Sequence, residues 1–210
     1  HAALAQRTAT ERGARDAQPK RRLHTRVGSG VAVDEAAILT TASVVLGAER
    51  LLVFSMFPQF SCSTTGSIYD AVTRAAFGRR CPLFFDRRRR MPALRFVPPY
   101  YDHLEYLGAL KTTIQEDLER SGIRPDHYLL TFHGIPYRYV AEGDPYRQQC
   151  EVTAQRLAQA LQLRDDQWTL GFQSRFGKEP WLEPYTDQLL HQLGSRGSRT
   201  LAAACPGFTA

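Results

Sequence analysis

The sequence predicts an α/β protein built from two units, each a parallel sheet flanked by helices, with a cleft between the units. In the second half of the chain, short apolar runs alternate with segments of helical periodicity in the order β-α-β-α-β. Such an order is typical of parallel strands joined by right-handed helical crossovers. In the first half, the nearly continuous apolar run 50–57 suits a strand that is covered on both faces.

The hydrophobic content, net charge and cysteines of the chain limit the kinds of partner and compartment to expect. The chain has 210 residues, is 43% hydrophobic and carries a formal net charge of +6. It contains no run of about 18 apolar residues, so we expect no membrane-spanning helix. A basic balance suits an acidic ligand, an anionic membrane surface or nucleic acid. No nucleic-acid recognition motif accompanies the arginines, so no nucleic-acid partner is expected. The four cysteines form no Cys-x-x-Cys pair, which predicts free thiols in a reducing, cytoplasmic setting.

We divide the chain into three parts. Residues 1–45 form a divergent basic segment, and residues 46–122 form part of the first unit. Residues 123–210 form the second unit, and the stretch 122–126 between the two units suits a hinge. The run Arg87–Arg90 lies in a Pro-flanked segment that predicts an exposed loop, where arginines serve as a solvated or anion-attracting surface rather than as a site.

The first unit is expected to hold two strands and two helices. Pro58 ends the first strand, and residues 61–66 form a loop that leads into a helix with one apolar face. The second strand covers 94–97. A longer helix begins at Asp102 and ends at Gly122, a residue type that favours the left-handed conformation after a helix. The apolar residues of this longer helix are spaced at three and four: Leu104, Leu107, Leu110, Ile114 and Leu118.

The second unit is more regular. Its strands are predicted over 127–132, 168–172 and 200–204. Asp144-Pro145 supplies an N-cap and first residue for the helix after the first of these strands. Glu183-Pro184 is expected to start the helix after the second strand. That helix has Leu189, Leu190 and Leu193 on its apolar side and Gly194 after its end.

Polar loops follow the ends of these strands. Ligands of open parallel sheets bind at the carboxyl ends of the strands, and there the sequence places His133, Gln173–Arg175 and Pro206–Phe208. A neutral imidazole accepts a proton or binds a borderline metal ion near neutral pH. The alternative for His133 is a structural histidine bonded to a backbone carbonyl. Asp144 is expected to cap its helix rather than to take part in chemistry.

Two other residue types in these loops have more than one interpretation. Arg175 and Lys178 suit binding of carboxylates, although cations in loops are usually only solvated. Trp181 suits stacking on a flat ring, and it equally suits a place in the core.

Five motifs, in this order and spacing, resemble the ferrochelatases of the bacterial protoheme type over residues 51–210. The motifs are Phe57–Ser67, Thr131–Pro136, Gly143–Cys150, Phe172–Pro184 and Cys205–Phe208. The resemblance implies two Rossmann-like, chelatase-type units with the porphyrin between them. It also implies insertion of ferrous iron into protoporphyrin IX to give protoheme, in heme biosynthesis.

The resemblance also implies roles for single residues. It makes His133 a ligand of the iron, which is a substrate, and an acceptor of pyrrole protons. Cys62 matches an iron–sulfur ligand of animal relatives, but partner cysteines are not found in this sequence, so a cluster is unsupported. Because porphyrins dissolve poorly, a peripheral contact with the membrane is compatible with the resemblance. The residues that line or border the porphyrin would be Phe57, which is tyrosine in many relatives, with Ser174, Phe176, Trp181 and Phe208.

One group that the resemblance implies is not in the printed sequence. A glutamate is expected a few residues beyond the Cys-Pro-Gly-Phe motif, and the final helices of the second unit would follow it. We therefore expect that this chain alone is inactive or poorly folded. Two alternatives stay open: a degenerate porphyrin-binding relative without catalysis, and a chelatase of the same architecture for another tetrapyrrole, such as sirohydrochlorin or coproporphyrin with iron or cobalt.

Overall fold

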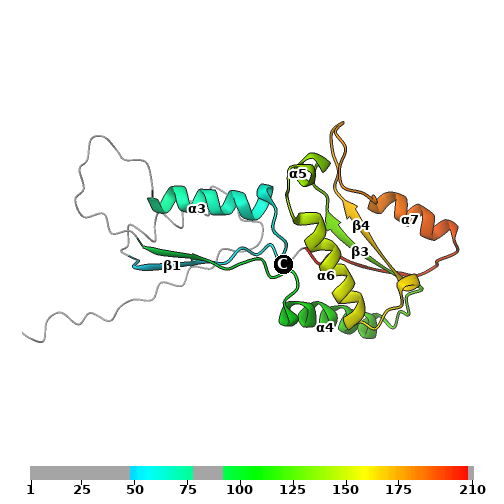
Figure 1. The fold of residues 1–210 in the computed structure, drawn as a ribbon. Coiled ribbons are helices and arrows are strands. Elements are labelled where there is room, and N and C mark those ends of the chain that lie inside the picture. The colour runs from blue at the N-terminus through cyan, green and yellow to red at the C-terminus, as the bar shows by residue number, and fades with distance from the viewer. Residues whose placement is uncertain (1–47, 78–91, 208–210) are drawn as a thin grey trace, which may run out of the picture.

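The computed structural model describes residues 48–77 and 92–207, and the interpretations of residues 1–45, Arg87–Arg90 and Phe208 lie outside these ranges. The described chain forms two parallel sheets flanked by helices, which confirms the α/β fold class (Figure 1). Its elements are β1 (Arg50–Val53), η1 (Cys62–Gly66), α3 (Ser67–Phe77), β2 (Ala93–Phe96), α4 (Leu104–Ser121), β3 (His127–His133), α5 (Tyr137–Ala141), α6 (Tyr146–Ala160), η2 (Asp165–Gln167), β4 (Trp168–Gln173), α7 (Thr186–Ser195) and β5 (Leu201–Ala204).

The first sheet pairs β1 with β2 in parallel, and α3 runs alongside it (Figure 1). Tyr69 of α3 fixes the helix to the sheet, since its hydroxyl donates to the Val97 carbonyl at 2.9 Å and its ring lies 4.2 Å from that of Phe96. The prediction of a strand over 50–57 that is covered on both faces is wrong. Strand β1 ends at Val53, and the side chains of Leu52 and Phe54 are 67% and 48% exposed.

The chain leaves the strand conformation because local hydrogen bonds hold the segment that follows. The Ser55 hydroxyl lies 3.3 Å from that of Thr65 and accepts from the Phe57 N–H at 3.3 Å. Ser61 then caps the helical turn η1, since its side chain accepts from the Ser63 N–H. These contacts turn the chain from the sheet into α3.

The second sheet has the order β4-β3-β5, with β3 in the centre. Successive strand residues face opposite sides of a sheet. Leu130 and Phe132 belong to the cluster that includes α6 residues, and both are fully buried. Thr131 faces the other side, where its hydroxyl lies 2.6 Å from that of Thr186 in α7. Helices therefore cover both faces of β3, as its apolar sequence predicts, and the three predicted strands of this unit are confirmed.

The main core lies between this sheet and helices α4 and α6. Helix α6 buries one face, which comprises Cys150, Thr153, Ala154, Leu157 and Ala158. Helix α4 contributes Leu107 and ends at Gly122, whose φ of 65° confirms the predicted left-handed position. Leu104 departs from the predicted apolar face, because it opens the first turn of α4 and is 79% exposed.

Boundaries of three helices differ from the prediction. Helix α4 begins at Leu104 rather than at Asp102, and α6 begins at Tyr146 rather than at Pro145. Helix α7 begins at Thr186 rather than at Glu183-Pro184, and it ends at Ser195, so Gly194 lies inside it. Leu189 and Leu193 are one turn apart and buried, whereas Leu190 is rotated away from them and is 44% exposed. The short helix α5 was not predicted, because its five residues are too few to give a periodic pattern.

Gly171 in β4 allows a close approach between the sheet and α7. A Cβ atom there would lie 2.8 Å from Leu189 Cδ1 and 2.9 Å from Thr186 Oγ1. We expect Gly171→Ala to lower the free energy of unfolding by about 1–3 kcal/mol, because the added methyl group overpacks this contact. Urea denaturation measures the change. Gly108→Ala in α4 is the matched control, since nothing lies within 4 Å of its Cβ; equal destabilisation of both variants would contradict the prediction.

Candidate functional site

His133 ends the central strand β3 and its side chain is exposed. Its Nδ1 lies 2.7 Å from the Gly134 carbonyl oxygen. A carbonyl only accepts, so Nδ1 carries the proton and Nε2 is the nitrogen with the lone pair. The backbone is fixed as well, because the Tyr146 hydroxyl of α6 donates to the His133 carbonyl at 2.9 Å. This tautomer gives His133 the form of imidazole that accepts a proton or binds a metal ion.

The motif around His133 and the motif 172–184 lie side by side. The Gly134 N–H donates to the Gln173 carbonyl at 2.8 Å, and the Leu182 N–H donates to the Ile135 carbonyl at 3.0 Å. Position 134 requires glycine for this approach, since a Cβ there would lie 3.1 Å from the Gln173 carbonyl oxygen and 3.3 Å from Trp181 Cε3. The structure thus brings together two motifs that the sequence separates by about forty residues.

Two aromatic side chains extend the site from His133. The ring centroid of Trp181 lies 6.4 Å from that of His133, and the centroid of Phe176 lies 4.9 Å from that of Trp181. Trp181 is 6% exposed, whereas Phe176 is 75% exposed. Trp181 therefore lies in the core, one of its two predicted places, and its stacking on a flat ring stays a prediction. Phe176 presents a ring to solvent at the edge of the same group.

The other predicted site residues make no described contact with His133, Trp181 or Phe176 or lie outside the described residues. Ser174 follows β4 with a φ of 68° and is exposed. Phe57 is half-buried and belongs to the first unit. Phe208 lies outside the described residues. The predicted contact of these three residues with a ligand stays a prediction.

Arg175 of the loop and Arg138 of α5 are both already paired with carboxylates. Arg175 makes an ion pair with Asp187 at 2.8 Å, and its guanidinium lies 3.9 Å from the centre of the Tyr185 ring. Arg138 pairs with Glu179 at 3.0 Å, so a cation that the sequence reading had not considered also borders this loop. These pairs tie the loop to α5 and α7. A carboxylate ligand would therefore compete with Asp187 for Arg175.

A second group of contacts joins the first unit to α6. The Phe60 N–H donates to Gln149 Oε1 at 2.7 Å, and Gln59 Nε2 donates to the Thr153 hydroxyl at 3.0 Å. Ser61 and Cys62 both donate to the carboxylate of Asp144, at 2.9 Å and 2.8 Å. Helix α6 thus carries one side of the core and holds the segment that follows Phe57.

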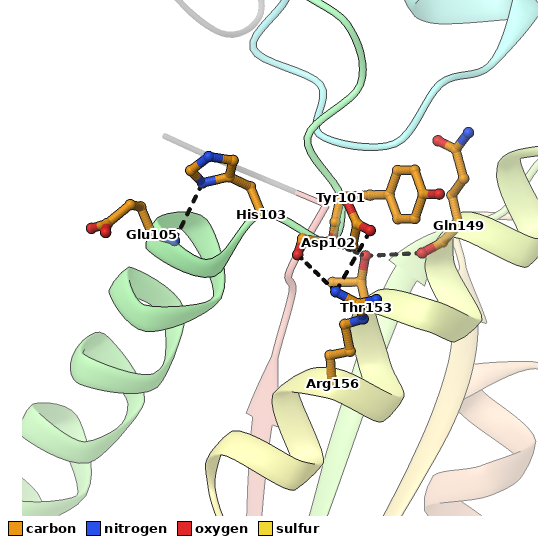
Figure 2. A network of polar contacts seen from close by, with 7 residues as sticks. All are labelled: Tyr101, Asp102, His103, Glu105, Gln149, Thr153 and Arg156. Carbon is orange, nitrogen blue, oxygen red and sulfur yellow. Dashed lines mark hydrogen bonds and ion pairs between the residues drawn. The ribbon is translucent and has the colours of Figure 1, made fainter.

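Figure 2 shows that α6 also holds the entry into α4. The Thr153 hydroxyl lies 2.8 Å from the Tyr101 carbonyl and 2.9 Å from that of Gln149, and Arg156 reaches the carbonyl and carboxylate of Asp102. The sequence reading missed these contacts between units. The available signal was Thr153, a polar residue on a helix face that is otherwise apolar, because a buried hydroxyl requires a partner.

Within residues 48–77 and 92–207, no group of three or more His, Cys, Asp and Glu side chains is placed to hold a metal ion. Two surface hollows among the described residues are lined mainly by α6 and β4 and by α4 and β5, and His133 lines neither of them. No described helix is long and apolar enough to cross a membrane.

Comparison with known proteins identifies the relatives of this chain. The family model described as Ferrochelatase matches residues 6–210. The chain belongs to the ferrochelatase family. It is 45% identical to Ferrochelatase 1 of Shewanella oneidensis over 162 residues. This alignment covers 77% of this chain and 46% of the Shewanella protein. It is 44% identical to a ferrochelatase of Teredinibacter turnerae over 163 residues. This second alignment covers 78% of this chain and 42% of the Teredinibacter protein.

A ferrochelatase of Nitrosococcus oceani is 44% identical over 162 residues, with 77% of this chain and 41% of that protein covered. The resemblance inferred from the five motifs is therefore confirmed. The chain spans less than half the length of these ferrochelatases.

Proposed function

We propose that the protein inserts ferrous iron into protoporphyrin IX to give protoheme, with His133 as a ligand of the incoming metal and an acceptor of pyrrole protons. The observation that carries the proposal is the His133 imidazole itself. It stands at the end of the central strand with its proton on Nδ1, beside the rings of Trp181 and Phe176. Membership of the ferrochelatase family gives this geometry its substrate class.

The chemistry needs a base and a rigid wall. Insertion exchanges two pyrrole N–H protons for one Fe²⁺ ion, so two protons must leave the ring for each metal ion that enters. The Nε2 lone pair of His133 can accept these protons in turn and pass them to solvent, since the side chain is exposed. Phe176 and Trp181 offer an apolar face for a flat ring. A wall that binds a bent porphyrin better than a planar one would favour metal entry.

The wider site is part of the same proposal. We place Phe57, Ser174 and Phe208 around the porphyrin, in a cleft between the first unit and the second. The two separate sheets support two units. The boundary near residues 122–126 stays a prediction, since α4 packs against α6 in the core of the second sheet. A cytoplasmic location and a peripheral contact with the membrane stay predictions, and the free thiols of Cys62, Cys150 and Cys205 agree with a reducing compartment.

The test is metal insertion by the purified chain. Protoporphyrin IX is mixed with Zn²⁺, or with Fe²⁺ under anaerobic conditions, and absorbance follows both bound porphyrin and metalloporphyrin. A rate above the protein-free background supports the enzyme, and it contradicts the expectation that this chain alone is inactive. Tight binding without insertion supports the non-catalytic alternative. Faster insertion into coproporphyrin or sirohydrochlorin, or of cobalt, supports the related chelatase, and no binding of any tetrapyrrole contradicts the proposal.

Phe176→Ala is expected to weaken protoporphyrin binding about tenfold, equivalent to roughly 1.4 kcal/mol, because the exposed ring would lie against the porphyrin. The fold should be unaffected, since the side chain is 75% exposed. Quenching of tryptophan fluorescence measures the affinity. Leu104→Ala is the matched control, an equally exposed apolar residue on α4. Equal affinities of the two variants would show that Phe176 does not contact the porphyrin.

A further inference from the structure

Asp144 is buried where the two units meet, and it is only 6% exposed. Its Oδ2 accepts from the Ser61 hydroxyl at 2.9 Å and from the Cys62 N–H at 2.8 Å, both in the first unit. Its Oδ1 accepts from the Tyr146 N–H at 3.0 Å, at the start of α6 in the second unit. The carboxylate therefore accepts three hydrogen bonds, and they come from both sides of the junction.

We propose that Asp144 is a positioning residue, which clamps the Ser61–Cys62 turn of the first unit to the start of α6 and so fixes the first unit relative to His133. This inference rests on the proposed function, in which the porphyrin lies between the two units. The predicted role of Asp144 as a helix cap describes only its bond to Tyr146. The positioning role also accounts for the two bonds that Asp144 accepts from Ser61 and Cys62 in the first unit.

Tyr146 connects this clamp to His133. Its N–H is held by Asp144, and its hydroxyl donates to the His133 carbonyl at 2.9 Å. Its side chain is buried, so the connection is not open to solvent. One residue of α6 thus links the carboxylate that holds the first unit to the backbone that carries the proposed metal ligand. A shift at Asp144 would change how the first unit faces the imidazole.

Other contacts keep the units together when this clamp is removed. Gln149 and Thr153 bind Phe60 and Gln59 further along α6, and the Tyr106 hydroxyl donates to the Pro206 carbonyl. The loss of Asp144 should therefore loosen the Ser61–Cys62 turn without separating the units. This predicts a local change in position rather than unfolding.

Asparagine cannot replace this carboxylate. Two of the three partners are backbone N–H groups, which only donate. An amide has one accepting oxygen, so in either orientation its NH₂ group faces at least one of those donors. Asp144→Asn therefore breaks the clamp while it keeps the shape of the side chain. Asp70→Asn is the matched control, because Asp70 is an exposed carboxylate of α3.

The reactivity of Cys62 reports on the clamp independently of catalysis, and two other cysteines serve as controls. Cys62 is exposed, and partial burial together with the charge of Asp144 raises the pKa of its thiol. Because the thiolate is the reactive form, Asp144→Asn should speed its alkylation about three- to tenfold. Cys205 is exposed in the second unit and serves as the reference, and Cys150 is buried, so its alkylation reports unfolding.

The experiment treats the chain, Asp144→Asn and Asp70→Asn with iodoacetamide, maps each modified cysteine by mass spectrometry, and measures protoporphyrin affinity on the same samples. We expect Cys62 alone to react faster in Asp144→Asn, and protoporphyrin affinity to fall about tenfold. If Cys62 reacts at the rate seen in Asp70→Asn, there is no clamp. If Cys62 reacts faster but the affinity is unchanged, Asp144 does not position the site.

A second variant keeps the test decisive. Should Cys150 become reactive in Asp144→Asn, that variant has unfolded, and Ser61→Ala then takes its place. Ser61→Ala removes one bond of the clamp and the cap of η1, and it keeps the charge of Asp144 and its bond to Tyr146. Because the charge stays, faster alkylation of Cys62 in this variant reports a loosened turn, and an unchanged rate shows that there is no clamp. Faster alkylation with unchanged affinity again shows that Asp144 does not position the site. If the unmodified chain binds no protoporphyrin, the proposed function fails and the positioning role fails with it, whereas the Cys62 rates still decide whether the clamp exists.

Discussion

Replacing His133 with alanine is expected to lower the rate of zinc insertion into protoporphyrin by about 10²- to 10⁴-fold, the usual effect of removing a positioned acid–base group. The variant loses the nitrogen that would take the pyrrole protons and bind the metal. It should still fold, since the side chain is exposed and the sheet bonds of its backbone remain. Its affinity for protoporphyrin should stay within a few-fold of the unmodified chain.

The rate is measured by absorbance, above the background of a sample without protein. His191→Ala is the matched control, because His191 is an exposed histidine of α7. An equal rate for His133→Ala and His191→Ala would contradict the role of His133. Where the unmodified chain gives no rate above background, the ligation measurement described at the end decides the role instead.

Phe132→Ala is expected to lower the free energy of unfolding by about 3–5 kcal/mol, which is a large share of the 5–15 kcal/mol that stabilises a typical domain. Phe132 is fully buried in the cluster between the second sheet and α6, and its ring centroid lies 6.5 Å from that of Phe172. Its loss leaves a cavity that the paired strands β3, β4 and β5 cannot close.

Chemical denaturation measures this change, with Phe176→Ala as the matched control. Both variants remove a phenylalanine, but Phe176 is 75% exposed and its loss should change stability by less than about 0.5 kcal/mol. A similar loss of stability in both variants would mean that the core is not where the structure places it. Because Phe132 precedes His133, its replacement should also reduce protoporphyrin affinity.

The second unit could be predicted well from its sequence because local and tertiary preferences agree there. The strand at 127–132 is mostly apolar, and helices cover both faces in the structure, where the hydroxyl of its Thr131 meets that of Thr186. The first unit is different. Its run at 50–57 has the same apolar character, yet Leu52 and Phe54 are largely exposed and the strand stops at Val53. The hydrogen bonds of Ser55 hold the segment just after this strand in another conformation, and no pattern in the run itself reveals them.

The site was predictable where it depends on the carboxyl ends of neighbouring strands. That rule placed His133 near the loop after β4, and the structure confirms the neighbourhood through Gly134 and Trp181. The rule could not give the pairing of Gln59 with Thr153, which joins residues 94 positions apart. Such bonds depend on how the units are arranged. The sequence left two alternatives for His133, a bond to a backbone carbonyl and a ligand role. The structure makes them compatible, because the Gly134 carbonyl binds only Nδ1.

The most direct test of the His133 proposal is the absorption spectrum of zinc protoporphyrin bound to the chain, since it requires no turnover. If His133 faces the metal, its imidazole becomes the axial ligand of zinc, and the Soret band shifts to the red in the chain and in His191→Ala. The proposal predicts that His133→Ala binds zinc protoporphyrin without this shift. An identical shifted spectrum in His133→Ala would show that His133 does not face the metal.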